Sequence, residues 1–286
     1  MIRPETEIRI ILVMFLACIF LGSGCAGNSN LTEKEPLQQI QDEDVNLPPK
    51  ATFKEIFATA KQDSKKLPGK LWSNTKATFT KTDNIAALLL AGGASVVLHQ
   101  EADENVADYF DKHQILQSGD NEAINLLGHP TIHSAAAGLW YFLSIRDRNN
   151  LNKERAWTMR NALTITFLTT AALKTIRHNK TPNDNNRAWP SGHTASSFTV
   201  ASVLDEYYGP KVGIPAYILA SLVGYRMIDT GDHWGSDVVF GATLGWVVGH
   251  TVAGPEKDLK IAGFDIVPYV PQTEKPAFGI SFVKRF

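Results

Sequence analysis

Six apolar stretches between residues 85 and 252 constrain the fold of this chain more than any other feature. They are Ile85–Leu98, Ile132–Ile145, Ala162–Leu173, Ser197–Leu204, Val212–Val223 and Val238–Val252. They are rich in Ala and Leu, mostly lack Pro and are bounded by polar clusters, which is typical of helices. Most hold about 12 to 15 residues, whereas a helix needs roughly 20 to cross a bilayer unaided. We expect an all-α helical bundle that is globular and tethered to a membrane, with short tilted spans as the alternative.

The first 25 residues resemble a targeting segment. Arg3 and Arg9 flank the start, and the apolar run Ile10–Leu21 has the length of a secretory signal core. Small residues and Cys25 follow, as in bacterial lipoproteins whose Cys becomes acylated, although Leu21 lies four residues before Cys25 rather than the usual three. We predict a lipoprotein-type anchor with Cys25 as the lipidation site. An uncleaved anchor is the alternative.

Three further segments follow this anchor. Residues 26–83 are expected to hold a polar tether and an N-terminal helix near Phe53–Gln62, while Lys70–Thr82 could lie on a membrane surface or on the domain. Residues 84–256 form the predicted helical domain. Residues 257–286 contain two runs of β-formers separated by a turn-like stretch, which predicts a C-terminal β-hairpin. The formal net charge of −1 gives no indication of nucleic-acid binding.

The segment Pro190-Ser191-Gly192-His193 opens one of the expected helices. Free N–H groups at a helix start, together with the helix dipole, favour a bound oxyanion. Ser191 adds a hydroxyl, and Gly192 lets the backbone approach a ligand closely. His193 would stand beside that anion and could give or take a proton.

A second segment, His233 to Asp237, opens the last apolar helix. A His and an Asp four residues apart on a helix share a face, so Asp237 could accept a hydrogen bond from one ring nitrogen of His233. The other nitrogen would then be free to act as a nucleophile. Arg226, seven residues earlier, supplies a fixed positive charge suited to phosphate oxygens.

Taken together, Lys174 to Asp237 resembles the type 2 phosphatidic acid phosphatase superfamily, which includes bacterial acid phosphatases and vanadium haloperoxidases. Its signature is Lys, six residues, Arg-Pro; then Pro-Ser-Gly-His; then Ser-Arg, five residues, His, three residues, Asp. Two departures stand out. Thr181 takes the place of the first Arg, with Arg177 and Lys180 nearby as substitutes for its charge. Tyr225 replaces Ser, and six residues instead of five separate Arg226 from the following His.

The resemblance implies a phosphatase that hydrolyses phosphate monoesters or diphosphates, with lipid-linked substrates expected because of the membrane anchor. His233 would form a phosphohistidine, Asp237 would orient it and His193 would protonate the leaving group. The implied phosphate-binding residues are Lys174, Ser191, Gly192 and Arg226. No metal or cofactor is expected, and the anchor places the enzyme at the periplasmic side of a bacterial envelope. The alternatives are a catalytically degenerate member with a binding or structural role and a vanadium-dependent haloperoxidase.

Other polar and aromatic residues near the motifs are given weaker roles. His178 could line the site. Trp189 and Trp234 are expected to pack in the core, with the alternative that they wall the pocket or stack on a substrate. Asp229 and Asp232 could repel a charged substrate or pair with Arg226. The remaining histidines, outside these motifs, are expected to be structural: His99, His113, His129, His133 and His250.

Overall fold

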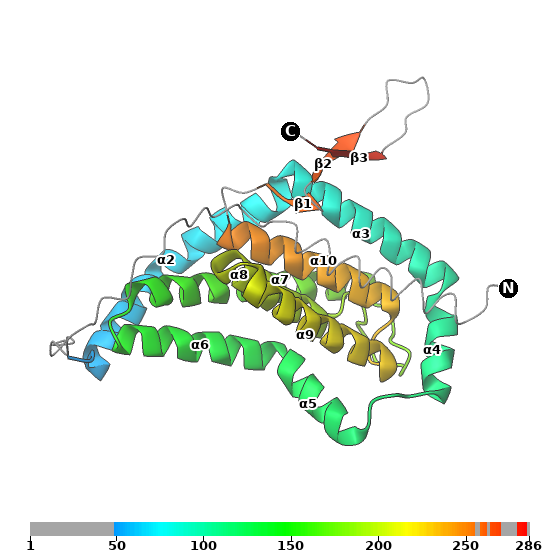
Figure 1. Cartoon of the computed structure of the whole chain (residues 1–286), viewed down its shortest axis with the longest axis horizontal. Helices are drawn as coiled ribbons and strands as arrows, with labels where there is room; N and C mark the ends of the chain where they lie inside the picture. Colours follow the sequence, from blue (N-terminus) through cyan, green and yellow to red (C-terminus); the bar gives the residue numbers. More distant parts are fainter. Residues whose placement is uncertain (1–48, 255–257, 262–263, 270–278, 285–286) are drawn as a thin grey trace, which may run out of the picture.

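The computed structural model describes residues 49–254, 258–261, 264–269 and 279–284, and within them it is a helical bundle with one small sheet (Figure 1). The described helices are α2 (Phe53–Thr80), α3 (Thr82–Glu101), α4 (Asp103–Lys112), α5 (Ser118–Gly128), α6 (Pro130–Arg146), α7 (Asn150–Arg177), α8 (Gly192–Tyr208), α9 (Pro210–Asp229) and α10 (Gly235–Ala253). The predicted all-α fold is confirmed, and each of the six apolar stretches lies in its own helix. The predicted anchor, including Cys25, lies outside the described residues.

Several helices are longer than the apolar stretches that predicted them. Helix α2 runs for 28 residues, well past the expected end at Gln62, and Pro68 lies inside it. It starts at a capping box in which Thr52 and Glu55 satisfy each other's backbone N–H groups. Its inner face packs on the bundle, where Leu71 and Phe79 contact the core, so the region after Lys70 rests on the domain. Polar helices α4 and α5 were not expected, because they lack a long apolar run.

Among the described helices, α8 and α10 have the most extensive contact, and three glycines on one face of α10 allow their close approach. A Cβ added at Gly241 would lie 2.7 Å from the Ser191 carbonyl oxygen, and one at Gly245 would lie 2.1 Å from the Ala195 carbonyl oxygen. At Gly249 it would lie 2.6 Å from the Ser202 side chain. This glycine seam, residues 241, 245 and 249, brings the N-termini of α8 and α10 together.

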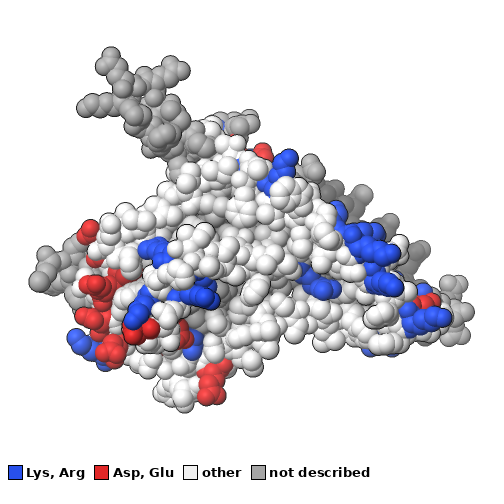
Figure 2. All heavy atoms as spheres, turned by 180° about the vertical axis from the view of Figure 1, so that it is seen from behind, with Lys and Arg blue, Asp and Glu red and all other residues white. Residues whose placement is uncertain are grey.

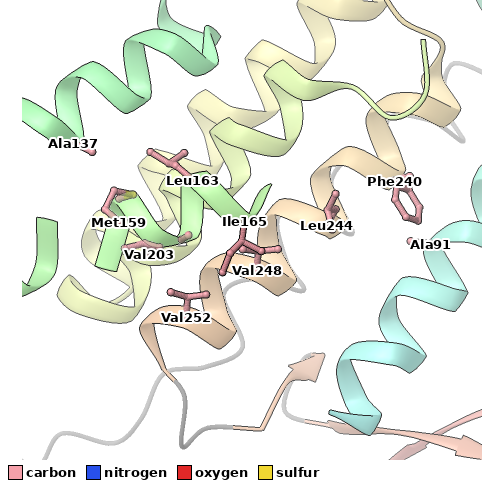
Figure 3. Close-up of a cluster of buried hydrophobic side chains, with 11 residues drawn as sticks. Ala91, Ala137, Met159, Leu163, Ile165, Val203, Phe240, Leu244, Val248 and Val252 are labelled. Carbon is pink, nitrogen blue, oxygen red and sulfur yellow. The ribbon is translucent and has the colours of Figure 1, made fainter. Parts of the chain in front are cut away.

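The largest buried cluster lies between α7, α8 and α10, with contributions from α3 and α6 (Figure 3). Its members are aliphatic side chains and one aromatic ring, with Val203, Leu244 and Val248 almost fully buried. Each fully buried Val, Leu or Ile side chain stabilises the fold by about 1.5–3 kcal/mol relative to exposure. The cluster therefore fixes the relative positions of the helices that carry the predicted site residues.

The tail forms a three-stranded antiparallel sheet in the order β1 (Lys260–Ile261), β2 (Phe264–Tyr269) and β3 (Gly279–Val283). Strands β2 and β3 pair from Asp265 with Val283 to Tyr269 with Gly279, which confirms the predicted hairpin. The short strand β1 was not expected, since it has two residues. The sheet lies beside the start of α3, far from the α8 and α10 N-termini (Figure 1).

Large apolar side chains are exposed on the outer faces of several helices. Examples are Leu89 and Val97 on α3, Leu139 on α6, Phe167 on α7 and Ile218 on α9. Figure 2 shows one face whose broad middle is mostly uncharged, with acidic side chains gathered towards one end. By length and composition, α3 is the one helix among the described residues that could cross a membrane, and a third of its apolar window is buried.

Candidate active site

Four helix ends meet where the predicted site residues lie: the C-termini of α7 and α9 and the N-termini of α8 and α10 (Figure 1). The two N-termini are joined directly, because the Ser191 N–H donates to the Asp237 carbonyl oxygen at 3.1 Å. Two positive helix-dipole ends therefore point to one region, which favours bound anions. The loops between these helices carry the two sequence motifs.

A pocket of about 590 Å³ opens at this meeting point. Its polar end contains Lys174, Gly192, His193 and His233, which the sequence predicted. Its other side is formed by Pro130, Leu163, Phe167 and Ala171, together with the hydroxyls of Thr131, Ser134, Thr166, Thr170 and Ser196. Within the described ranges, no group of three or more His, Cys, Asp or Glu side chains is placed to hold a metal ion. The pocket thus joins a cationic, histidine-lined end to an apolar wall.

His193 is the second residue of α8 and faces this pocket. Its Nε2 atom is buried and has no hydrogen-bond partner among the described residues, so it is available to a ligand. Burial lowers the pKa of His193 to about 4, and the nearby charges of His233, His129 and Arg226 act in the same direction. In the empty pocket, His193 is therefore neutral near pH 7.

His233 and Asp237 are paired, but the expected geometry is wrong in one respect. His233 precedes α10 and is not on its surface, because Trp234 is the N-cap residue. The Asp237 carboxylate reaches back over the first turn, with its Oδ2 atom 3.3 Å from His233 Nδ1 and accepting the Trp234 N–H at 3.1 Å. This contact leaves His233 Nε2 for a ligand. The His233 side chain is only 10% exposed and that of Asp237 is fully buried.

A second buried carboxylate supports the same helix start. Asp103, the first residue of α4, accepts the Ser236 N–H at 3.0 Å and the Ser236 hydroxyl at 2.5 Å. The Asp103 Oδ2 atom, which accepts the Ser236 hydroxyl, also lies 2.9 Å from His99 Nδ1, and the His99 ring meets Trp234 edge to face. Because Ser236 lies between His233 and Asp237, this network fixes the backbone that carries the pair.

Lys174 occupies the last turn of α7 and lines the pocket. Its Nζ atom donates to the carbonyl oxygens of Arg187 and Ala188 at 2.6 and 2.9 Å. Burial lowers the pKa of Lys174 to about 8, while the charge of Asp237 opposes this shift. The ammonium group is thus held at the pocket by the loop that precedes α8.

Arg226, in the last turn of α9, is buried and bonded to two polar side chains. Its Nε atom donates to Asn121 Oδ1 of α5 at 2.6 Å, and its Nη1 atom forms an ion pair with Asp232. Its charge acts on His193, which places it near the pocket, although it is not a lining residue. The longer loop before His233 therefore still leaves Arg226 close to the site.

Ser191 and Gly192 form the start of α8. Ser191 is fully buried as the N-cap residue, and its hydroxyl bonds to the Thr194 hydroxyl at 2.9 Å and accepts the Thr194 N–H at 3.4 Å. The Ser191 side chain is therefore committed to the helix cap and does not line the pocket. Gly192 does line it, and no heavy atom lies within 4 Å of a Cβ added there.

The residues that could replace the missing Arg at Thr181 do not reach the pocket wall. Thr181 is buried in a turn in which its hydroxyl accepts the Asn185 N–H at 3.1 Å. Lys180 forms an exposed ion pair with Asp184 at 2.6 Å. Arg177 lies over the ring of Trp189, 5.2 Å from its centroid. Lys174 therefore lines this corner of the pocket, whereas Arg177 and Lys180 do not.

Four other residues near the motifs lie outside the pocket lining: Trp189, Trp234, His178 and Asp229. Trp189 packs on Phe240 in the core and donates to Ser95, whereas Trp234 donates to the Lys180 carbonyl oxygen. His178 ends α7 in a left-handed conformation and is exposed outside the pocket lining. Asp229 accepts the N–H groups of Ile115 and Leu116, so its role is structural.

Two residues near the site were missed by sequence reasoning. His129, the N-cap of α6, lines the pocket and meets the His193 ring edge to face at 5.2 Å. Its position directly before Pro130 marks a helix start, which was the available signal. Asn121 of α5 holds Arg226 across 105 residues of sequence, and no local pattern points to such a contact.

The chain is similar to known proteins over part of its length. Residues 169–254 match the model of the PAP2 superfamily. A lipid A 1-phosphatase from Porphyromonas gingivalis is 40% identical over 65 residues, a match that covers 22% of this chain and 15% of that protein. The crystal structure of a transmembrane PAP2 type phosphatidylglycerolphosphate phosphatase from Bacillus subtilis is 20% identical, with a TM-score of 0.48 over 62% of this chain and 96% of its own. The matched region contains α8, α9 and α10 and the pocket residues Lys174, His193 and His233, and in this region the chain is similar to the PAP2 superfamily.

Proposed function

We propose that this protein is a metal-independent lipid phosphatase that cleaves phosphate monoesters or diphosphates through a phosphohistidine on His233. The observation that carries the proposal is the single pocket that joins His193, His233 and Lys174 to an apolar wall. The lipid A 1-phosphatase similarity, although it covers a small part of that protein, supports the same class of reaction.

In the proposed reaction, His233 Nε2 attacks phosphorus and the bond from phosphorus to the ester oxygen breaks. The negative charge of the bound phosphate raises the pKa of His193, so its ring is protonated in the complex. Its Nε2 atom then gives a proton to the departing oxygen and later takes one from the water that attacks the phosphohistidine. Asp237 keeps the His233 ring in the correct tautomer and stabilises its positive charge. Lys174, Arg226 and the N–H groups at the start of α8 stabilise the developing charge on the phosphate oxygens.

The apolar wall gives the reason for a lipid-linked substrate. Phe167 is 62% exposed on α7 and belongs both to the pocket and to the apolar outer surface. An acyl or prenyl chain could follow this surface from a membrane into the pocket while its phosphate meets the histidines. We propose that the protein attaches to a bacterial envelope membrane through residues 1–25, with Cys25 acylated and the site facing the periplasm.

The test is turnover of p-nitrophenyl phosphate and of a lipid panel of phosphatidate, phosphatidylglycerol phosphate, undecaprenyl diphosphate and lipid A phosphates. We expect hydrolysis in the presence of EDTA, a preference for the lipids and no turnover by His233→Ala. His113→Ala is the matched control, because His113 is not part of the pocket lining and, among the described residues, bonds to the Tyr109 carbonyl oxygen and stacks on the Tyr109 ring. Loss of all turnover with EDTA, or unchanged turnover in His233→Ala, would contradict the proposal.

Attachment is tested separately with labelled fatty acid in cells. We expect the protein to carry the fatty-acid label on Cys25. The label should be lost in Cys25→Ser and retained in Cys18→Ser. Label on neither cysteine would show that the anchor is not acylated.

A further inference from the structure

We propose that Asp232 competes with substrate phosphate for Arg226 and so sets the affinity of the site for anions. This inference rests on the proposed function, because it concerns the phosphate clamp of the same site. It assigns a role to a carboxylate that the reaction itself does not need.

The contacts of Arg226 show that its charge is already neutralised. The Asp232 carboxylate forms an ion pair with Nη1, and Asn121 accepts from Nε at 2.6 Å. The Arg226 side chain is only 10% exposed. A phosphate that binds Arg226 through Nη1 must therefore share this nitrogen with Asp232 or displace that residue.

The loop before His233 directs Asp232 to this position. His233 N–H donates to the Met227 carbonyl oxygen at 2.9 Å, which folds the loop back on the end of α9. The Thr230 hydroxyl donates to the Asp232 carboxylate at 3.1 Å. Six residues separate Arg226 from His233, and the last of them is Asp232. The loop length thus places an acidic side chain between the clamp and the proposed nucleophile.

Unequal burial decides which partner moves when an anion binds. The Asp232 side chain is 35% exposed, whereas the Arg226 side chain is 10% exposed and held by Asn121 from a separate helix. Turning a partly exposed carboxylate into water costs far less than removing a buried guanidinium from its partners. Asp232 is therefore the group that leaves. Asp232 also directly precedes His233, which lines the pocket, so its charge lies near a phosphate bound there.

The experiment measures binding of inorganic phosphate to the full-length protein by isothermal titration calorimetry at one pH and one ionic strength. Asp232→Asn should lower the dissociation constant about tenfold or more, because it removes a competing charge. Asp232→Glu should stay close to the wild type. Asp184→Asn is the matched control, since it removes an exposed acidic charge that pairs only with Lys180, and it should leave the constant unchanged.

Two further variants make the result specific to the clamp. Adding Arg226→Gln to Asp232→Asn should abolish the gain, because no freed guanidinium remains. Asn121→Asp should weaken phosphate binding, because it adds a second carboxylate beside Arg226, and this expectation holds even where Asp232→Asn fails to fold. Equal or weaker binding by a folded Asp232→Asn protein, or unchanged or tighter binding by Asn121→Asp, would overturn the inference. So would an absence of measurable phosphate binding to every variant.

Turnover is measured in a separate assay, so the two proposals can fail independently. Tighter phosphate binding by Asp232→Asn without any hydrolysis by the wild type would refute the phosphatase and support the competition. Hydrolysis by the wild type, together with equal phosphate binding by the wild type and Asp232→Asn, would support the phosphatase and refute the competition.

Discussion

The glycine seam between α8 and α10 makes a quantitative prediction for Gly245→Ala. The added Cβ would lie 2.1 Å from the Ala195 carbonyl oxygen and 2.9 Å from both Phe198 Cβ and Thr199 N, all inside the 3.0 Å limit that real Cβ atoms respect. Two of these three atoms belong to the α8 backbone, so no side-chain rotation relieves the contact. Overpacking typically costs 1–3 kcal/mol, and we expect about 3 kcal/mol here because the helices must separate.

The matched control is Gly138→Ala on α6. No heavy atom lies within 4 Å of a Cβ added at Gly138, which is inside a helix. This substitution should be neutral or stabilise the protein by roughly 0.5–1 kcal/mol, because Ala loses less backbone entropy than Gly. The pair therefore compares the same chemical change at a packed and an open position.

Thermal unfolding of the two variants in one buffer provides the measurement. Gly245→Ala should lower the midpoint by about 6 °C or more, while Gly138→Ala should leave it unchanged or raise it slightly. Phosphatase turnover per folded molecule should also fall in Gly245→Ala, since separation of α8 from α10 strains the bond between Ser191 N–H and the Asp237 carbonyl oxygen. A Gly245→Ala protein as stable as the wild type would refute the role given to the seam.

Three further predictions concern the site. The KM for phosphate esters should rise as the pH increases through about 8, because Lys174 is charged below that pH and neutral above it, and Lys174→Arg should remove this rise. As the pH increases, kcat/KM should begin to decrease at a lower pH than kcat. The profile of kcat/KM reports His193 in the free enzyme, where its pKa is about 4, whereas the profile of kcat reports the complex, in which the bound phosphate raises that pKa. Identical pH profiles would contradict this prediction. Asp103→Asn should lower kcat more than it changes KM, since it loosens Ser236 beside His233, whereas Asp108→Asn, an exposed substitution on the same helix, should change neither.

The fold was predictable where a segment's own composition decides its structure. The six apolar stretches became helices because each can bury one face in a shared core. The extent of α2 was not predictable, since its continuation past Gln62 depends on Leu71 and Phe79 packing on other helices. Helices α4 and α5 carry mostly polar residues, so their stability comes from contacts such as Asp103 with Ser236.

The sequence likewise predicts some of the site residues but not the contacts that hold them. His193, His233 and Lys174 were predictable as a group because a motif preserves their spacing, and the structure gathers them in one pocket. The environment of Arg226 was not predictable, because Asn121 meets it from α5, distant in sequence. The role of Ser191 was ambiguous, since a hydroxyl before a helix can cap it or bind a ligand, and here it caps α8.

The covalent intermediate on His233 is the most direct test of this account. Substrate with a labelled phosphoryl group is mixed with enzyme, quenched within milliseconds under alkaline conditions that preserve phosphohistidine, and digested for mass spectrometry. The account predicts a transient, acid-labile phosphoryl group on the peptide that contains His233. With a substrate whose leaving group needs no protonation, His193→Ala should make this intermediate last longer, because its hydrolysis is slower. Turnover without any such label, or label on another residue, would contradict it.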